Sequence, residues 1–154
     1  MNARIEELYS LLVPLSEGRL VVPRACIAEV IGFTEPEPVA GAPPWLLGRI
    51  EWNGRKIALA SFEGICGDAL PQSGPRSRLV VFRAISDALP SRFFALITQG
   101  FPQLVRVNPV VLAPDTAHEW PDDSPVLCQV RMVNQRPMIP DLERVEQLIA
   151  EALG

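Results

Sequence analysis

The chain has 154 residues, of which 48% are hydrophobic and 21% are charged, and its net charge is −4. This length and apolar share predict one domain with a buried core, and the acidic balance excludes the basic excess with which proteins bind nucleic acid. No apolar stretch approaches the ~20 residues of a membrane-spanning helix, so we expect no direct insertion into a membrane.

The N-terminal part of the sequence is typical of short strands. Proline occurs 16 times, and because proline interrupts helices, this number argues against a helical bundle. Apolar runs separated by turn residues predict strands at 8–15, 19–23 and 25–31. Glu29 is the only charge in the third run, and a charged side chain among apolar neighbours must face water or a partner. The proline-rich segment 34–44 is predicted to be a loop.

The clearest local signal is Asn53-Gly54, which lies between the apolar runs 45–52 and 55–62. Asn-Gly is typical of a type I′ hairpin turn, because both central residues of that turn need positive φ. We expect a short helical turn at 62–67 and a polar loop at 68–77 after the hairpin.

The second half continues the pattern of short strands. We predict them at 78–84, 91–98, 103–112 (one or two broken strands), 126–133 and 136–139. The last two form a hairpin around Asn134-Gln135, and the acidic segment 115–125 is predicted to be a solvated loop.

The chain closes with one predicted helix. Asp141 is a suitable N-cap, and apolar residues recur after it along one face: Leu142, Val145, Leu148, Ile149, Ala152 and Leu153. About ten short strands, one or two helices and no βαβ rhythm predict an all-β fold, either a barrel or a pair of barrels.

Motifs of enzymes are absent from the sequence. There is no phosphate-binding loop, no dinucleotide-binding glycine motif and no G-x-S-x-G. The single histidine, His118, lies beside Glu119 in the acidic segment, and one histidine without a second ligand in spacing cannot build an ordinary zinc site. We therefore predict no catalytic residue, no metal and no cofactor. The three cysteines show no C-x-x-C spacing, which predicts reduced thiols in the cytoplasm.

The order of the segments resembles the CheW-like domain of chemosensory coupling proteins. Ile27-Ala28-Glu29-Val30 is similar to the family's V-x-E-[IV] segment, and Pro44-Trp45-Leu46-Leu47-Gly48 to the start of its next strand. The closing segment 128–149 resembles the family's last hairpin and terminal helix. The resemblance covers residues 8–152 as a single domain. Polar positions depart from the family's pattern in three places: Asn53 stands where N-L-R-G has arginine, Ser61 where V-x-D-L has aspartate, and Thr98-Gln99 where the later hairpin has V-D.

The resemblance implies two small five-stranded SH3-like β-barrels around a shared hydrophobic core, with a short C-terminal helix and no catalytic activity. It implies an adaptor that couples the cytoplasmic tips of methyl-accepting receptors to the regulatory domain of a chemotaxis-type histidine kinase, in the cytoplasm at receptor arrays. By position it assigns partner contacts to Ile27, Glu29, Gly48 and Asn53. Trp45 joins them, because an exposed tryptophan is typical of an interface anchor.

Two alternatives stay open. The first is a divergent accessory scaffold that binds another CheW-like protein, for example in a type IV pilus chemosensory system, and the missing arginine at Asn53 is in keeping with it. The second is a small-ligand barrel or enzyme centred on His118.

Overall fold

The computed structural model describes residues 8–108, 113–115, 120–132 and 135–154. The described residues form eleven strands, a short 3₁₀ helix and two α-helices, which confirms the mostly β architecture with one C-terminal helix. The strands are β1 (Leu8–Pro14), β2 (Arg19–Pro23), β3 (Ile27–Gly32), β4 (Leu46–Trp52), β5 (Arg55–Ala60), β6 (Arg78–Arg83), β7 (Phe93–Thr98), β8 (Gln103–Val107), β9 (Ala113–Asp115), β10 (Val126–Arg131) and β11 (Met138–Pro140). The helices are η1 (Arg24–Cys26), α1 (Phe62–Ile65) and α2 (Leu142–Leu153).

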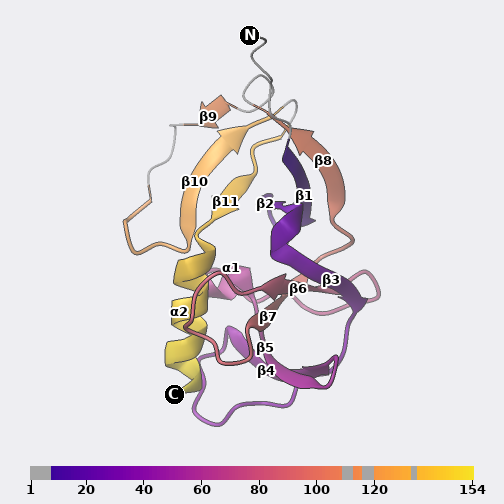
Figure 1. The fold of residues 1–154 in the computed structure, drawn as a ribbon, viewed down its shortest axis with the longest axis vertical. Coiled ribbons are helices and arrows are strands. Elements are labelled where there is room, and N and C mark those ends of the chain that lie inside the picture. The colour runs from indigo at the N-terminus through magenta and orange to yellow at the C-terminus, as the bar shows by residue number, and fades with distance from the viewer. Residues whose placement is uncertain (1–7, 109–112, 116–119, 133–134) are drawn as a thin grey trace.

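The strands form two sheets that lie one above the other in Figure 1. The upper, six-stranded sheet has the order β8-β1-β2-β11-β10-β9, so it is built from both ends of the chain. The lower, five-stranded sheet has the order β3-β6-β7-β5-β4 and comes from the middle of the chain. Pairing is antiparallel except between β2 and β11 and between β5 and β7. The upper sheet has one strand more than expected, because residues 113–115 pair with β10 as β9.

The predicted hairpin is confirmed. Trp52 pairs with Arg55 across the turn, and Asn53 and Gly54 have φ of 52° and 76°. Both central residues thus have the positive φ that a type I′ turn requires, and asparagine and glycine adopt it at the lowest cost.

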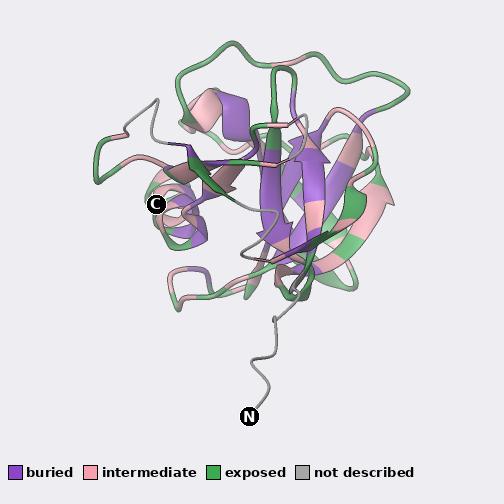
Figure 2. Ribbon diagram, turned by 90° about the horizontal axis from the view of Figure 1, so that it is seen from above, coloured by how far each residue is buried: buried purple, intermediate pink, exposed green. Residues whose placement is uncertain are grey.

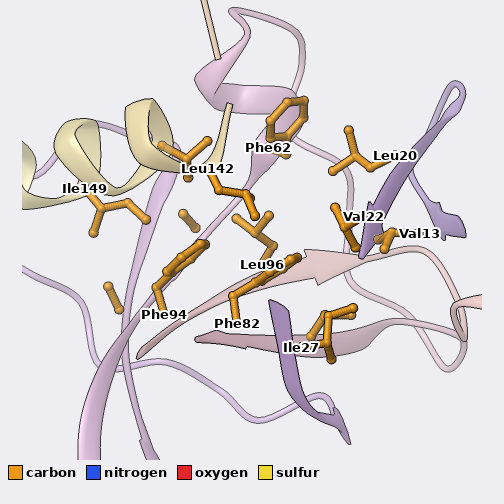
Figure 3. Packing of buried hydrophobic residues seen from close by; sticks show 14 of the residues in the cluster. Val13, Leu20, Val22, Ile27, Phe62, Phe82, Phe94, Leu96, Leu142 and Ile149 are labelled. Atoms are coloured by element: carbon orange, nitrogen blue, oxygen red, sulfur yellow. The ribbon is translucent and has the colours of Figure 1, made fainter. Parts of the chain in front are cut away.

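A hydrophobic core joins the two sheets. Buried residues concentrate in the strands, whereas the loops are largely exposed (Figure 2). The largest cluster takes side chains from both sheets, from α1 and from α2, and Figure 3 shows Leu142 and Ile149 of α2 on the same core as Phe82, Phe94 and Phe62. Each sheet also has a smaller cluster of its own. The expected shared core is therefore present, and burying it accounts for the docking of the two sheets on each other.

The C-terminal helix forms as predicted. The carboxylate of Asp141 accepts a hydrogen bond from the backbone N–H of Arg144 at 3.1 Å, which satisfies one of the free donors of the first turn. The face of α2 turned toward the core consists of Leu142, Val145, Glu146 and Ile149, all buried. The glutamate on this face was not anticipated from the apolar stripe.

Two local expectations were wrong. Residues 24–26 form the helix η1 rather than the start of a strand, since β3 begins only at Ile27. Asp115 is not in a solvated loop: it ends β9 opposite Gln129, is 9% exposed, and its carboxylate lies 3.8 Å from the Nε of Arg136. The guanidinium compensates the burial of the carboxylate. Residues 109–112, His118, Glu119 and Asn134, on which other expectations rest, lie outside the described residues.

Candidate partner-binding groove

An open groove of about 680 Å³ lies where the two sheets meet. The upper sheet contributes Tyr9 and Leu11 of β1. The linker η1 and the lower sheet contribute the rest of the lining: Arg24, Ala25, Ile27, Ala28, Glu29, Val30 and Arg83. Because its two walls belong to different sheets, the shape of the groove depends on the relative position of the sheets.

The groove brings together Ile27 and Glu29, two of the residues predicted from the sequence. Ile27 is 8% exposed and packs into the shared core, so it supports the groove more than it is available for contact. Glu29 is exposed on β3. A β-bulge lies between these two residues in the pairing of β3 with β6, and a bulge commonly redirects a side chain.

Arg83 fixes the start of β3. Its Nη1 donates hydrogen bonds to the backbone oxygens of Ile27 at 2.6 Å and Ala25 at 3.1 Å. The guanidinium of β6 thereby ties down the backbone that forms one end of the groove. Hydrogen bonds from a charged donor are stronger than those between neutral groups.

The apolar lining of the groove continues onto β8. Leu11 lies opposite Leu104, and Tyr9 opposite Arg106, so these four side chains share one face of the β1–β8 pair. Tyr9 is 44% exposed and Leu104 is 52% exposed, and the guanidinium carbon of Arg106 lies 5.4 Å from the centre of the Tyr9 ring. The apolar residues that alternate onto the outward face of β1 and β8 are the sequence signal for this strip.

The charges at the groove and the strip are mainly positive. Arg24 and Arg83 line the groove and Arg106 lies beside Tyr9, against the single carboxylate of Glu29. An apolar strip bordered by arginines is electrostatically complementary to an apolar surface bordered by acidic side chains.

Glu29 also has a partner within the chain. Its Oε1 accepts a hydrogen bond from the indole Nε1 of Trp52 at 3.2 Å. The Trp52 ring lies 4.9 Å from the ring of Phe93, and the guanidinium of Arg55 lies 5.2 Å from the Phe93 ring centre. The tip of the β4–β5 hairpin is thus held against the body of the lower sheet.

The other predicted contact residues lie on or beside β4. Asn53 is exposed at the tip of the hairpin. It follows Trp52, whose indole N–H donates to Glu29. Gly48 is buried, and a Cβ there would overlap the backbone oxygen of Glu37. Trp45 is partly buried against the shared core, and a Cβ on Gly64 would lie 2.6 Å from its Cβ. The structure does not bring Gly48 and Trp45 into the groove.

Two thiols are held in the neutral form. Burial, followed by the carboxylates of Asp68 and Glu63, raises the pKa of Cys66 to about 11. Burial and then the carboxylate of Glu146 raise the pKa of Cys26, although Arg83 lowers it. Neither thiol has the depressed pKa of a nucleophilic cysteine.

Within the described part of the chain, no three His, Cys, Asp or Glu side chains are grouped so that they could hold a metal ion. No helix of that same part is long and apolar enough to cross a membrane.

Comparisons with known proteins relate the chain to a family and to solved structures. The model of the CheW-like domain family matches residues 10–146. The crystal structure of the scaffolding protein TtCheW from Thermoanaerobacter tengcongensis superposes with a TM-score of 0.75, covering 89% of this chain and 90% of that one at 14% sequence identity. At that identity the likeness concerns the fold. No curated protein matches the sequence.

Proposed function

The chain belongs to the CheW-like domain family, and from this premise we propose that it is a non-catalytic adaptor that couples methyl-accepting receptors to a chemotaxis-type histidine kinase. The observation that carries the proposal is the groove between the sheets, which contains Glu29 and continues into the apolar strip of Tyr9 and Leu104. An adaptor needs docking surfaces on a stable body, and an open groove with an exposed apolar extension supports this role.

We assign the groove to the receptor tip. The apolar strip suits the apolar stripe of a helix, and Arg24, Arg83 and Arg106 suit acidic residues that border that stripe. Leu104 is the side chain expected to matter most on the strip, because it is 52% exposed in the free protein and its burial removes apolar area from water.

We assign the kinase regulatory domain to the tip of the β4–β5 hairpin. Asn53 is exposed there, and the packing of Trp52 on Phe93 stiffens the tip. A surface that is rigid before binding loses less conformational entropy when a partner docks. With two partners on two surfaces, the chain bridges receptor and kinase physically, and signal transfer then corresponds to a coupling free energy between the two sites.

The proposal is tested by calorimetric titration of the protein with each partner separately. We expect Leu104→Asp to lower the affinity for the receptor fragment by at least tenfold and to leave the affinity for the kinase domain unchanged. Leu127→Asp is the matched control, because Leu127 is 62% exposed on β10 of the same sheet, and β10 pairs with β11 and β9 and not with the strands β1 and β8 that form the strip. Equal effects of the two variants, or no saturable binding of either partner, would overturn the assignment. Binding only to another CheW-like protein would instead establish the accessory scaffold.

A further inference from the structure

Two buried glutamates connect the sheets in a way that the adaptor role does not by itself require. Glu63 of α1 is 6% exposed and Glu146 of α2 is 0% exposed. A carboxylate that leaves water needs compensation from hydrogen bonds or charges. In both cases backbone N–H groups of the opposite half of the molecule provide it.

Glu63 binds the turn between β1 and β2. Its Oε2 accepts hydrogen bonds from the backbone N–H and from the hydroxyl of Ser16, both at 3.0 Å. Helix α1 directly follows β5 of the lower sheet, whereas Ser16 belongs to the upper sheet's β1–β2 turn.

Glu146 makes the reciprocal connection. It accepts hydrogen bonds from the N–H of Ile85 at 2.9 Å, the N–H of Ser86 at 3.0 Å and the hydroxyl of Ser86 at 2.6 Å. Helix α2 follows β11 of the upper sheet, whereas Ile85 and Ser86 lie in the loop between β6 and β7 of the lower sheet. Each sheet therefore contributes one carboxylate and one turn.

We propose that Glu63 and Glu146 are positioning residues that lock the two sheets in the orientation in which the groove can bind its partner. The proposal rests on the proposed function of the groove and adds to it which residues set the groove's shape. Apolar contacts are non-directional, whereas the five hydrogen bonds to the two carboxylates, three from backbone N–H groups and two from serine hydroxyls, favour one orientation of the sheets. The walls of the groove, β1 and β3, belong to the two sheets that these bonds hold together.

Substitution by glutamine separates the effect of the negative charge and its hydrogen bonds from the effect of the side chain's shape. A glutamine amide retains one oxygen acceptor. At Glu146 its NH₂ group would face the N–H of Ile85 or of Ser86, because each carboxylate oxygen accepts from one of them. At Glu63 both hydrogen bonds from Ser16 go to Oε2, so the amide oxygen retains them without the negative charge. Glu63→Gln/Glu146→Gln therefore keeps the packing volume, removes both charged acceptors and breaks at least one hydrogen bond between α2 and the β6–β7 loop. Glu143→Gln/Glu151→Gln is the matched control, because both of its glutamates are exposed on α2 and the same charge is removed.

The experiment measures the orientation of the sheets and the binding separately. Nitroxide labels at Arg19→Cys on β2 and Glu51→Cys on β4, with the native cysteines replaced by alanine, report the distance between the sheets in the free protein by pulsed electron resonance. We expect a broadened or shifted distance distribution in Glu63→Gln/Glu146→Gln, and the parental distribution in the control. Calorimetry without labels should show about tenfold weaker binding of the receptor fragment and unchanged binding of the kinase domain at the hairpin tip.

The outcomes separate this inference from the proposed function. An unchanged distance distribution overturns the inference, whichever partners bind. A changed distribution with unchanged affinity for the groove partner overturns the link between orientation and binding. If the receptor fragment fails to bind even the parent protein, the proposed function fails and the distance measurement still decides the locking role. Should the double glutamine variant not fold, Ser16→Ala/Ser86→Ala removes one hydroxyl donor from each carboxylate and should produce a smaller change in the same direction.

Discussion

Trp52 and Glu29 join the two edge strands of the lower sheet. The indole N–H of Trp52 on β4 donates to the carboxylate of Glu29 on β3 at 3.2 Å, and β3 and β4 are the first and last strands in the order of that sheet. The side-chain bond therefore brings the sheet edges together, as closure toward a barrel requires. It also links the groove, which Glu29 lines, to the hairpin tip beside Trp52.

Variants at this pair should separate charge from hydrogen bonding. Glu29→Lys removes the carboxylate acceptor from the groove lining. If this carboxylate contacts a donor of the receptor, its loss outweighs the added positive charge, and we expect a folded protein that binds the receptor fragment at least tenfold more weakly. Glu29→Gln retains an acceptor for Trp52 and should bind almost as the parent does. Titration calorimetry and near-ultraviolet circular dichroism would test this. Unfolding of Glu29→Lys, or parental affinity in it, would contradict a contact role for this carboxylate.

Gly48 should tolerate no side chain. Its φ is 145°, and a Cβ would overlap the backbone oxygen of Glu37. That oxygen cannot retreat easily, because it accepts a hydrogen bond from the N–H of Arg49 at 2.8 Å. We expect Gly48→Ala to lower the free energy of unfolding by more than about 2 kcal/mol, measured by urea denaturation.

Gly32 on β3 provides the control for Gly48. A Cβ at Gly32 meets nothing within 4 Å, so Gly32→Ala should change the free energy of unfolding by less than about 1 kcal/mol. A similar loss in both variants would indicate that steric overlap with Glu37 is not the cause.

Cys66 should react slowly with alkylating reagents although it is exposed. Burial of its sulfur and the nearby Asp68 and Glu63 carboxylates raise the pKa of this thiol from 9.0 to about 11, and the thiolate is the reactive form. In the unfolded chain the thiol ionises near its ordinary value, so the unfolded state loses its proton first as the pH rises. The free energy of unfolding should therefore fall as the pH increases from 9 to about 11.

The rate of Cys66 modification by iodoacetamide, followed by mass spectrometry, tests the pKa directly. Asp68→Asn removes one cause of the shift and should raise the rate at pH 8. Half-maximal reactivity near pH 9 in the parent protein would contradict the raised pKa.

The sequence was most informative where the signal is local. The turn at Asn53-Gly54 and the apolar stripe of α2 depend on residues within a few positions of each other, and both predictions are confirmed. The groove depends on β1 meeting β3 and β6, a consequence of long-range pairing that no local pattern contains. Glu146 illustrates the same limit, because its donors at Ile85 and Ser86 are about 60 positions away. The local pattern indicates the burial of Glu146 only through its position inside the apolar stripe of α2.

Asn53 should have a role in the turn and a separate role in binding. Its φ of 52° favours asparagine or glycine, so Asn53→Gly should keep the hairpin stable while removing the side chain. Asn53→Ala removes the same polar group but opposes positive φ, and we expect it to cost about 1 kcal/mol in the free energy of unfolding. If Asn53 contacts the kinase domain, both variants should lower the affinity for that domain, measured by calorimetry, by a similar factor. If Asn53→Gly binds as the parent does and only Asn53→Ala is weakened, the side chain serves the turn and the assigned contact is wrong.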